Sequence, residues 1–198
     1  MGVSIEDIKK LKELTGVGLG DAKAALVETD GDFDKALEAM RKKGLTKAEK
    51  KGDRETREGV IDSYVHSGRI GVVVEVNCET DFVARLDDFK KLAHEIAMQI
   101  AAMSPQYVTE ADIPAEEMER VKAEAEERVK NEGKPAEIAA KIVEGQVKKH
   151  FAEKVLMSQM YILDDSKTVE QYVKENIAKL GENIVIRQFK RIELGVNE

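Results

Sequence analysis

Residues 59–89 read GVIDSYVHSGRIGVVVEVNCETDFVARLDDF, and the spacing of the apolar residues changes within this stretch. From position 70 to position 78, apolar side chains occur at every second residue, which is the period of a strand with one buried face. They are Ile70, Val72, Val74, Val76 and Cys78. The preceding HSGR, residues 66–69, predicts a hairpin turn that joins this strand to an earlier one.

A helical period follows the second strand. The apolar residues that fall on one face of this helix are Phe89, Leu92, Ala93, Ile96, Ile100 and Met103. Asp87 or Asp88 is expected to cap its N-terminus, because a short acidic side chain can accept a hydrogen bond from the first free N–H groups. The stretch therefore predicts a β-hairpin with a long helix beside it.

Residues 4–43 predict a compact unit of three short helices, with apolar residues at helical spacing in the first of them. Asp32 is expected to cap the third helix and Gly44 to close it, so that this helix ends near Lys43. Residues 45–58 offer few apolar side chains and predict a charged linker. The domain prediction is residues 1–44, a linker at 45–58, and a core at 59–198.

The remainder of the core is predicted to be mostly helical. A charged helix with a thin apolar stripe at Met118, Val121, Ala125 and Val129 is followed by helices near 136–158 and 167–180. The final NIVIRQFKRIEL, residues 183–194, predicts a strand that returns to the hairpin. The fold class is therefore α+β: a small antiparallel sheet packed against helices, preceded by a three-helix domain.

Composition restricts the class of protein. The 198 residues carry a net charge of −7, which argues against direct binding of nucleic acid through phosphates. The single cysteine excludes an intramolecular disulfide. The chain start has no apolar signal core, and the sequence has no apolar run of membrane length, so we expect a soluble cytoplasmic protein with no membrane contact.

Candidate catalytic and metal-binding patterns are weak. The glycines of TGVGLG, residues 15–20, follow a helix and lack the P-loop pattern, so a helix-to-helix turn is the better interpretation. His66, His94 and His150 have no metal-ligand spacing. Cys78 shares the apolar face of a strand and is expected to be a buried hydrophobe. We therefore expect a binding protein with no cofactor, no metal and no bond-breaking chemistry of its own.

The acid and the aromatic in TDFVAR, residues 80–85, allow two interpretations. In the first, Thr80 or Asp81 caps a helix and Phe82 packs into the core. In the second, Asp81 and Phe82 project from the end of the strand as a wedge for a partner's pocket. The residues alone favour the first interpretation.

Three stretches resemble the family of bacterial elongation factor Ts: LKELTGVGLGDAKAAL at 11–26, NCETDFVAR at 77–85 and LGENIVIRQF at 180–189. The resemblance implies a ubiquitin-associated-like N-terminal domain. It further implies a guanine-nucleotide exchange factor that binds elongation factor Tu, loosens GDP and its magnesium ion, and needs no cofactor.

The same resemblance implies particular binding residues. Asp81 and Phe82, with the flanking Thr80 and Val83, correspond to the residues that intrude beside the magnesium site of the GTPase. The N-terminal contact is carried over to Lys12, Thr15, Gly16, Leu19 and Lys23. Leu19 is followed here by Gly20, whereas the family often has two hydrophobic residues, so the contact is expected to be narrower. His66 corresponds to a hairpin-tip histidine that reaches the partner.

The chain resembles the short family members with one core module, whereas longer members carry two related modules and an added helical hairpin. A single module suggests a non-covalent homodimer, with Phe189 and Ile192 of the last strand and the adjacent sheet edge as the expected contact. Two alternatives remain open. One is an interaction module that binds another partner through the N-terminal domain without exchange activity, and the other is an enzyme that uses Cys78 and a histidine.

Overall fold

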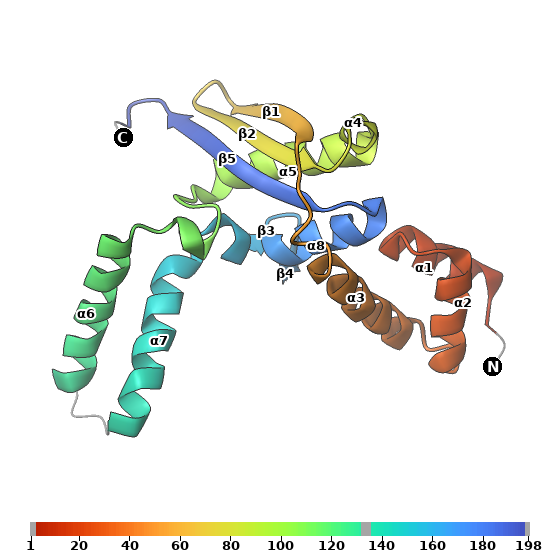
Figure 1. The fold of residues 1–198 in the computed structure, drawn as a ribbon, viewed down its shortest axis with the longest axis horizontal. Coiled ribbons are helices and arrows are strands. Elements are labelled where there is room, and N and C mark those ends of the chain that lie inside the picture. The colour runs from red at the N-terminus through yellow and green to blue at the C-terminus, as the bar shows by residue number, and fades with distance from the viewer. Residues whose placement is uncertain (1–2, 132–135, 197–198) are drawn as a thin grey trace.

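The computed structural model describes residues 3–131 and 136–196. A central sheet and its covering helices carry two projections, a helical unit at the N-terminus and a hairpin of two long helices (Figure 1). The helical unit comprises α1 (Ile5–Thr15), α2 (Leu19–Glu28) and α3 (Phe33–Glu49). Its buried side chains are Leu11, Ala22, Ala25, Leu26, Ala36 and Met40. Three helices around a small core confirm the fold expected for the N-terminal residues.

Helix α3 does not end near Lys43 as expected. Asp32 caps its start, with the Lys35 N–H 3.1 Å from the Asp32 carboxylate, but the helix passes through Gly44 and ends at Glu49. A Cβ on residue 44 would lie 3.4 Å from the Cβ of Ala178 on α8 (Val169–Leu180), so glycine allows the two helices to pack closely. Ala48 is buried in the main core. This burial favours the longer helix over the glycine stop signal, and the expected linker is helical in its first part.

In the described residues, three strands form an antiparallel sheet in the order β1 (Glu58–His66), β2 (Ile70–Cys78) and β5 (Ile184–Glu193). Ser67 and Gly68 form the turn between β1 and β2, and both have a positive φ, 50° and 67°. This is the left-handed turn conformation that matches the twist of a hairpin. The structure therefore confirms the hairpin and the returning strand.

One face of the sheet packs on α5 (Asp87–Met103), and the apolar stripe predicted for this helix is buried as far as Ile100. Met103 is 43% exposed, so the buried stripe is shorter than expected. Neither Asp87 nor Asp88 is the cap, because α5 begins at Asp87 and Leu86 takes the N-cap position. The two carboxylates lie in the first turn, where their negative charge interacts favourably with the helix dipole. A separate short helix, α4 (Asp81–Ala84), precedes α5.

The opposite face of the sheet is exposed. Its large apolar side chains are Ile61, Val65, Val73 and Ile192, which are between 49% and 74% exposed. Val65 and Ile192 both pair with Gly71, so the three strands bring the two side chains to one end of this face. Phe189 packs against the main core, so only Ile192 of the two residues expected in a dimer contact is free at the surface.

The two helices α6 (Ala115–Asn131) and α7 (Ala136–Ala152) pack together and project from the core as a helical hairpin (Figure 1). Val121, Ala125 and Val129 are buried, as the apolar stripe of the charged helix predicts. The resemblance to short family members led us to expect an added hairpin only in the longer members. The described residues nevertheless contain a helical hairpin, formed by α6 and α7.

Helix α7 ends at Ala152, earlier than expected, and a small β-hairpin that we did not predict follows it. This hairpin comprises β3 (Met160–Tyr161) and β4 (Asp164–Thr168). Gln99 of α5 is fully buried and holds β3: its amide donates to the Met160 carbonyl at 3.1 Å and its oxygen accepts from the Ile162 N–H at 2.9 Å. Strands this short have no detectable period in the sequence.

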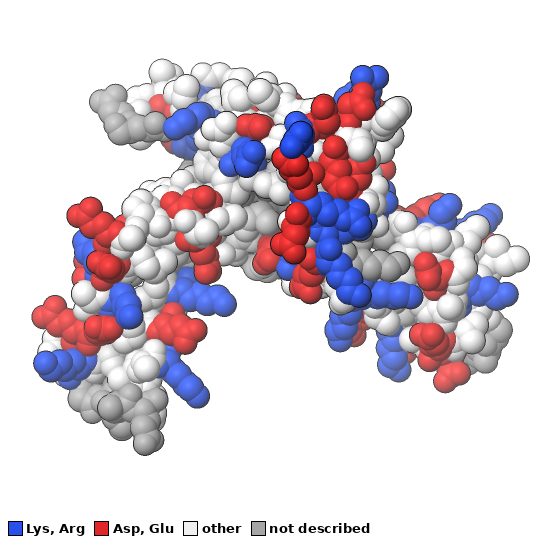
Figure 2. Space-filling model, viewed as in Figure 1, with Lys and Arg blue, Asp and Glu red and all other residues white. Residues whose placement is uncertain are grey.

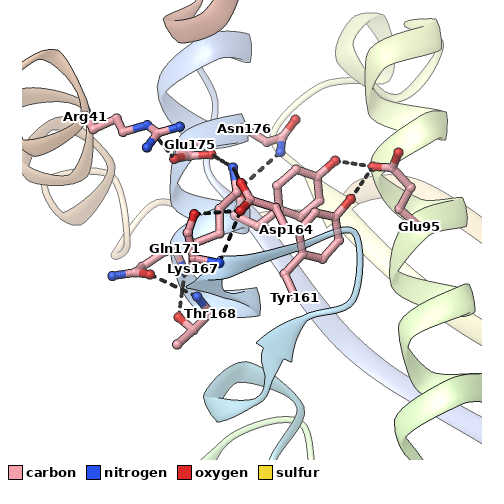
Figure 3. A network of polar contacts seen from close by, with 11 residues as sticks. Arg41, Glu95, Tyr161, Asp164, Lys167, Thr168, Gln171, Glu175 and Asn176 are labelled. Atoms are coloured by element: carbon pink, nitrogen blue, oxygen red, sulfur yellow. Dashed lines mark hydrogen bonds and ion pairs between the residues drawn. The ribbon is translucent and has the colours of Figure 1, made fainter. Parts of the chain in front are cut away.

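A polar network joins the helical unit to the core (Figure 3). The Lys167 ammonium lies 2.7 Å from Glu175 and 3.2 Å from Asp164, and Glu175 also faces Arg41 of α3 at 3.6 Å. The Ser166 hydroxyl donates a 2.6 Å hydrogen bond to Asp164 and, as the largest cause, lowers the pKa of that carboxyl to about 2. The network therefore ties α3, β4 and α8 together.

The same network extends to α5 through two tyrosines (Figure 3). The rings of Tyr161 and Tyr172 are stacked with centroids 4.2 Å apart, and both hydroxyls donate to the Glu95 carboxylate. Burial raises the pKa of both phenols far above the usual range, so they are hydrogen-bond donors at any physiological pH. They fix α8 and the small β-hairpin against α5.

Candidate functional site

The candidate site is the segment between β2 and α5. Thr80 caps α4 by accepting a 3.4 Å hydrogen bond from the Val83 N–H, which confirms one part of the first interpretation. The other part is wrong: Phe82 is 77% exposed, while Val83 is 8% exposed and belongs to the core. Ala84 is also buried, at 6%, so the core side of this turn is filled by Val83 and Ala84, and Phe82 lies on its solvent side.

Asp81 lies beside Phe82 on the outer side of α4. Its side chain is 44% exposed, and its carboxylate is 2.8 Å from the Arg85 guanidinium one turn later. An ion pair this exposed contributes little to stability. Asp81 and Phe82 are thus presented at the surface together, whereas Thr80 and Val83 hold the turn that carries them.

Sequence reasoning missed three residues that fix this segment: Glu79, Glu182 and Asn183. Glu182 accepts hydrogen bonds from Thr80 and from the backbone of residues 79 and 80, and Glu79 accepts one from the backbone of Asn183. Glu182 and Asn183 stand in LGENIVIRQF, but more than a hundred residues separate them from Thr80. Only the packing of β5 beside β2 brings them to the site.

The residues carried over to the N-terminal contact differ in their surroundings. Lys12, Leu19 and Lys23 are exposed, and Leu19 is 52% exposed. The Thr15 hydroxyl donates to the Leu11 carbonyl at 2.6 Å, so it is bonded within its own helix. Three further apolar residues of this unit, Ile5, Leu14 and Val27, are also more than half exposed.

Gly16 has a structural role. Its φ of 66° ends α1, and its N–H donates to the Lys12 carbonyl at 2.8 Å. A Cβ at this position would come within 2.5 Å of Lys179 Cγ on α8. Glycine therefore allows both the left-handed turn and the close approach of the helical unit to the core.

His66 lies at the tip of the β1–β2 hairpin and is exposed. Its Nδ1 is 3.0 Å from the Tyr64 hydroxyl, which orients the ring. His66 pairs with Ile70 at the start of β2, whereas Phe82 follows the end of the same strand. At about 3.3 Å per residue the strand is about 26 Å long, so one chain does not bring His66 and Phe82 together.

Chemistry other than binding has little support in the described part of the chain. No group of three or more histidine, cysteine, aspartate or glutamate side chains is arranged to hold a metal ion among the described residues. Cys78 is fully buried, and burial raises the pKa of its thiol to about 11, which makes it a poor nucleophile. Within residues 3–131 and 136–196, no helix is both long and apolar enough to span a membrane.

Acidic and basic residues alternate over much of the visible face, which also carries a group of basic residues between the helical unit and the sheet (Figure 2). Figure 2 shows acidic and basic residues interleaved over the helical unit and over the α6–α7 hairpin on the visible face. A surface that binds nucleic acid through its phosphates gathers lysine and arginine instead. This distribution agrees with the net charge of −7.

Comparison with known proteins gives a consistent result over nearly the whole chain. A family model described as Elongation factor TS matches residues 45–196. Elongation factor Ts of Fervidobacterium nodosum is 50% identical over 196 residues, which cover 98% of this chain and 100% of that protein. Elongation factor Ts of Coprothermobacter proteolyticus is 52% identical with the same coverage, and that of Thermotoga neapolitana is 52% identical over 98% of both chains. The three-helix unit, the antiparallel sheet and these matches together show that this chain belongs to the elongation factor Ts family.

Proposed function

We propose that this protein is the guanine-nucleotide exchange factor of elongation factor Tu, and that Asp81 and Phe82 form the wedge that promotes GDP release. The observation that carries this proposal is the exposure of Phe82, at 77%, on a helical turn that Val83 and Ala84 anchor in the core. A large aromatic at the surface of a rigid turn is suited to enter a partner's pocket. Family membership supports the identity of the partner.

The wedge acts on the partner's magnesium site. A bound Mg²⁺ is the largest local charge that holds the phosphates of a nucleotide, so displacing its surroundings weakens GDP binding. A phenyl ring seated between two elements of the GTPase stabilises their displaced positions. Because coupling is reciprocal, GDP weakens binding of the factor by the same free energy, about 1.4 kcal/mol for each tenfold change.

The helical unit provides a second contact with the GTPase. Its exposed Lys12, Leu19 and Lys23 are the expected contact residues, and Leu14 and Val27 add apolar surface to the unit. Thr15 and Gly16 contribute through the shape of the turn. We propose the unit of α1, α2 and α3 as the docking domain, the segment between α3 and β1 as the connection, and the part of the chain from β1 onward as the core that carries exchange.

A homodimer completes the proposed binding surface. The exposed sheet face with Ile61, Val65, Val73 and Ile192 is the contact that we favour, since a flat apolar face of this kind is rarely left in water. His66 and Phe82 lie at opposite ends of β2, so a two-fold dimer can present His66 of one subunit and Phe82 of the other to one GTPase. The contact is non-covalent, since Cys78 is buried.

The proposed reaction makes and breaks no covalent bond, so the factor needs neither a cofactor nor a metal of its own. It does not bind nucleic acid directly. As a translation factor it acts in the cytoplasm.

Release of fluorescent GDP from elongation factor Tu tests the proposal. Substoichiometric factor should accelerate release in the presence of excess unlabelled GDP, and Phe82→Ala should remove most of the acceleration. If the protein neither binds the GTPase nor changes the release rate, the alternative of an interaction module for another partner is favoured. If Cys78→Ala abolishes acceleration while the fold is retained, a role for the thiol must be reconsidered.

A further inference from the structure

The wedge lies on a segment that is fixed by two carboxylates, and each of them belongs to a residue just outside one of two neighbouring strands. Glu79 follows the end of β2, and Glu182 precedes the start of β5. Because β2 and β5 are antiparallel, these two positions meet at the same end of the sheet, next to α4.

Glu182 holds the first residues of the wedge segment. One of its oxygens accepts from the backbone N–H groups of Glu79 and Thr80, at 3.1 and 3.0 Å. The other accepts from the Thr80 hydroxyl at 2.7 Å. The same hydroxyl accepts from the Val83 N–H, so a continuous chain of hydrogen bonds runs from Glu182 into α4. Hydrogen bonds to an ionised carboxylate are the stronger kind.

Glu79 forms the reciprocal half of the arrangement. Its carboxylate accepts from the Asn183 N–H at 2.6 Å and lies 3.5 Å from the Arg54 guanidinium. The Asn183 side chain, which is 3% exposed, donates to the carbonyls of Gly52 and Arg54 at 3.2 and 2.9 Å. The segment that connects the helical unit to β1 is therefore bonded to the same cluster.

We infer that Glu182 is a positioning residue for exchange: it holds Asp81 and Phe82 at the angle at which they enter the GTPase. This inference rests on the proposed function. An exposed phenyl ring can displace an element of a partner only if its own backbone resists the opposing force. Burial does not fix the start of this segment, because Thr80 is only half-buried and the buried side chains begin at Val83. The start of the segment is therefore held by its polar contacts. Glu182 makes three of those contacts.

The test is Glu182→Gln in GDP release from elongation factor Tu at several factor concentrations. Glutamine keeps the length of the side chain but replaces one acceptor oxygen with an NH₂ donor, which faces donors at Thr80 or the backbone. We expect the maximal release rate to fall by about tenfold, the factor that corresponds to one hydrogen bond to a charged group. The half-saturating concentration should change much less, because the helical unit still docks.

Glu170→Gln is the matched control. Glu170 is also a carboxylate, paired with Lys174 at 2.9 Å, but it lies in the first turn of α8 and not at the wedge segment. It should leave the maximal rate unchanged. A loss as large as that of Glu182→Gln would attribute the effect to the loss of a negative charge in general and overturn the inference.

A double-mutant cycle separates positioning from general damage to the fold. If Glu182 acts through the wedge, Glu182→Gln should have little further effect once Phe82→Ala has removed the ring. Independent, multiplicative losses would overturn the inference, as would a Glu182→Gln variant with the maximal rate of the parent. If Glu182→Gln does not fold, Glu182→Asp, which withdraws both oxygens by one methylene group, replaces it with the same expectations. A parent protein that does not accelerate release contradicts the proposed function itself.

Discussion

The loss of stability caused by Phe82→Ala shows whether Phe82 is an exposed partner-binding residue or a core residue. Phe82 is 77% exposed, so less than a quarter of its surface is covered in the folded protein. For an aromatic side chain that can bury about 200 Å², this leaves about 45 Å², or about 1 kcal/mol at 25 cal/mol per Å². The realistic loss is smaller, since the unfolded chain also covers part of the ring.

Phe89→Ala is the matched comparison. Phe89 is the same residue type seven positions later, but it is fully buried between the sheet and α5. Removing a buried phenyl ring costs about 3–5 kcal/mol. Urea unfolding followed by circular dichroism should therefore give a near-parental midpoint for Phe82→Ala and a large decrease for Phe89→Ala. Similar losses for the two variants would refute the assignment of Phe82 to the surface.

Three further predictions concern the turn at Gly16, the acid range and the open sheet face. Gly16→Ala should lower the thermal midpoint by several degrees, because residue 16 has a φ of 66° and a Cβ there would meet Lys179 of α8. Gly20→Ala should leave the midpoint unchanged, because nothing lies within 4 Å of a Cβ at residue 20. Equal midpoints for the two variants would contradict the docking of α1 on α8. The pKa of Asp164 is lowered to about 2, so the ionised carboxylate stabilises the fold fully above about pH 4, and this stabilisation is lost as the pH falls through 2. Asp164→Asn should therefore make stability less dependent on pH in this range. An unchanged acid-unfolding curve would contradict this role of Asp164. Sedimentation equilibrium under reducing conditions tests the proposed dimer: the parent protein should be dimeric and Ile192→Glu monomeric, whereas a monomeric parent would refute the dimer and a dimeric variant would place the contact elsewhere.

The hairpin and α5 could be predicted because burial on one side leaves a clear period in the sequence. Val72, Val74 and Val76 face the core at every second position, and Leu92 and Ile96 recur at the helical spacing of α5. The same reasoning failed at Gly44, where a local stop signal was outweighed by contact with α8 and by the burial of Ala48. Tertiary packing of this kind leaves no local pattern.

The candidate site was predicted in part, for a related reason. Residue types alone suggested a capped turn at Thr80, and that turn is present. They also favoured a buried Phe82, since aromatic side chains are usually covered, whereas the buried residues of this turn are Val83 and Ala84. The contact of Glu182 with Thr80 joins residues more than a hundred positions apart, so sequence spacing gives no sign of it.

Stopped-flow release of fluorescent GDP from elongation factor Tu in the presence of Mg²⁺ tests the central claim most directly. The parent protein, in substoichiometric amount, should increase the release rate clearly above that of the GTPase alone. Phe82→Ala, with an unchanged circular dichroism spectrum, should lose most of that increase. An increase of the same size with Phe82→Ala, or none with the parent protein, would contradict the assignment of Asp81 and Phe82 as the exchange wedge.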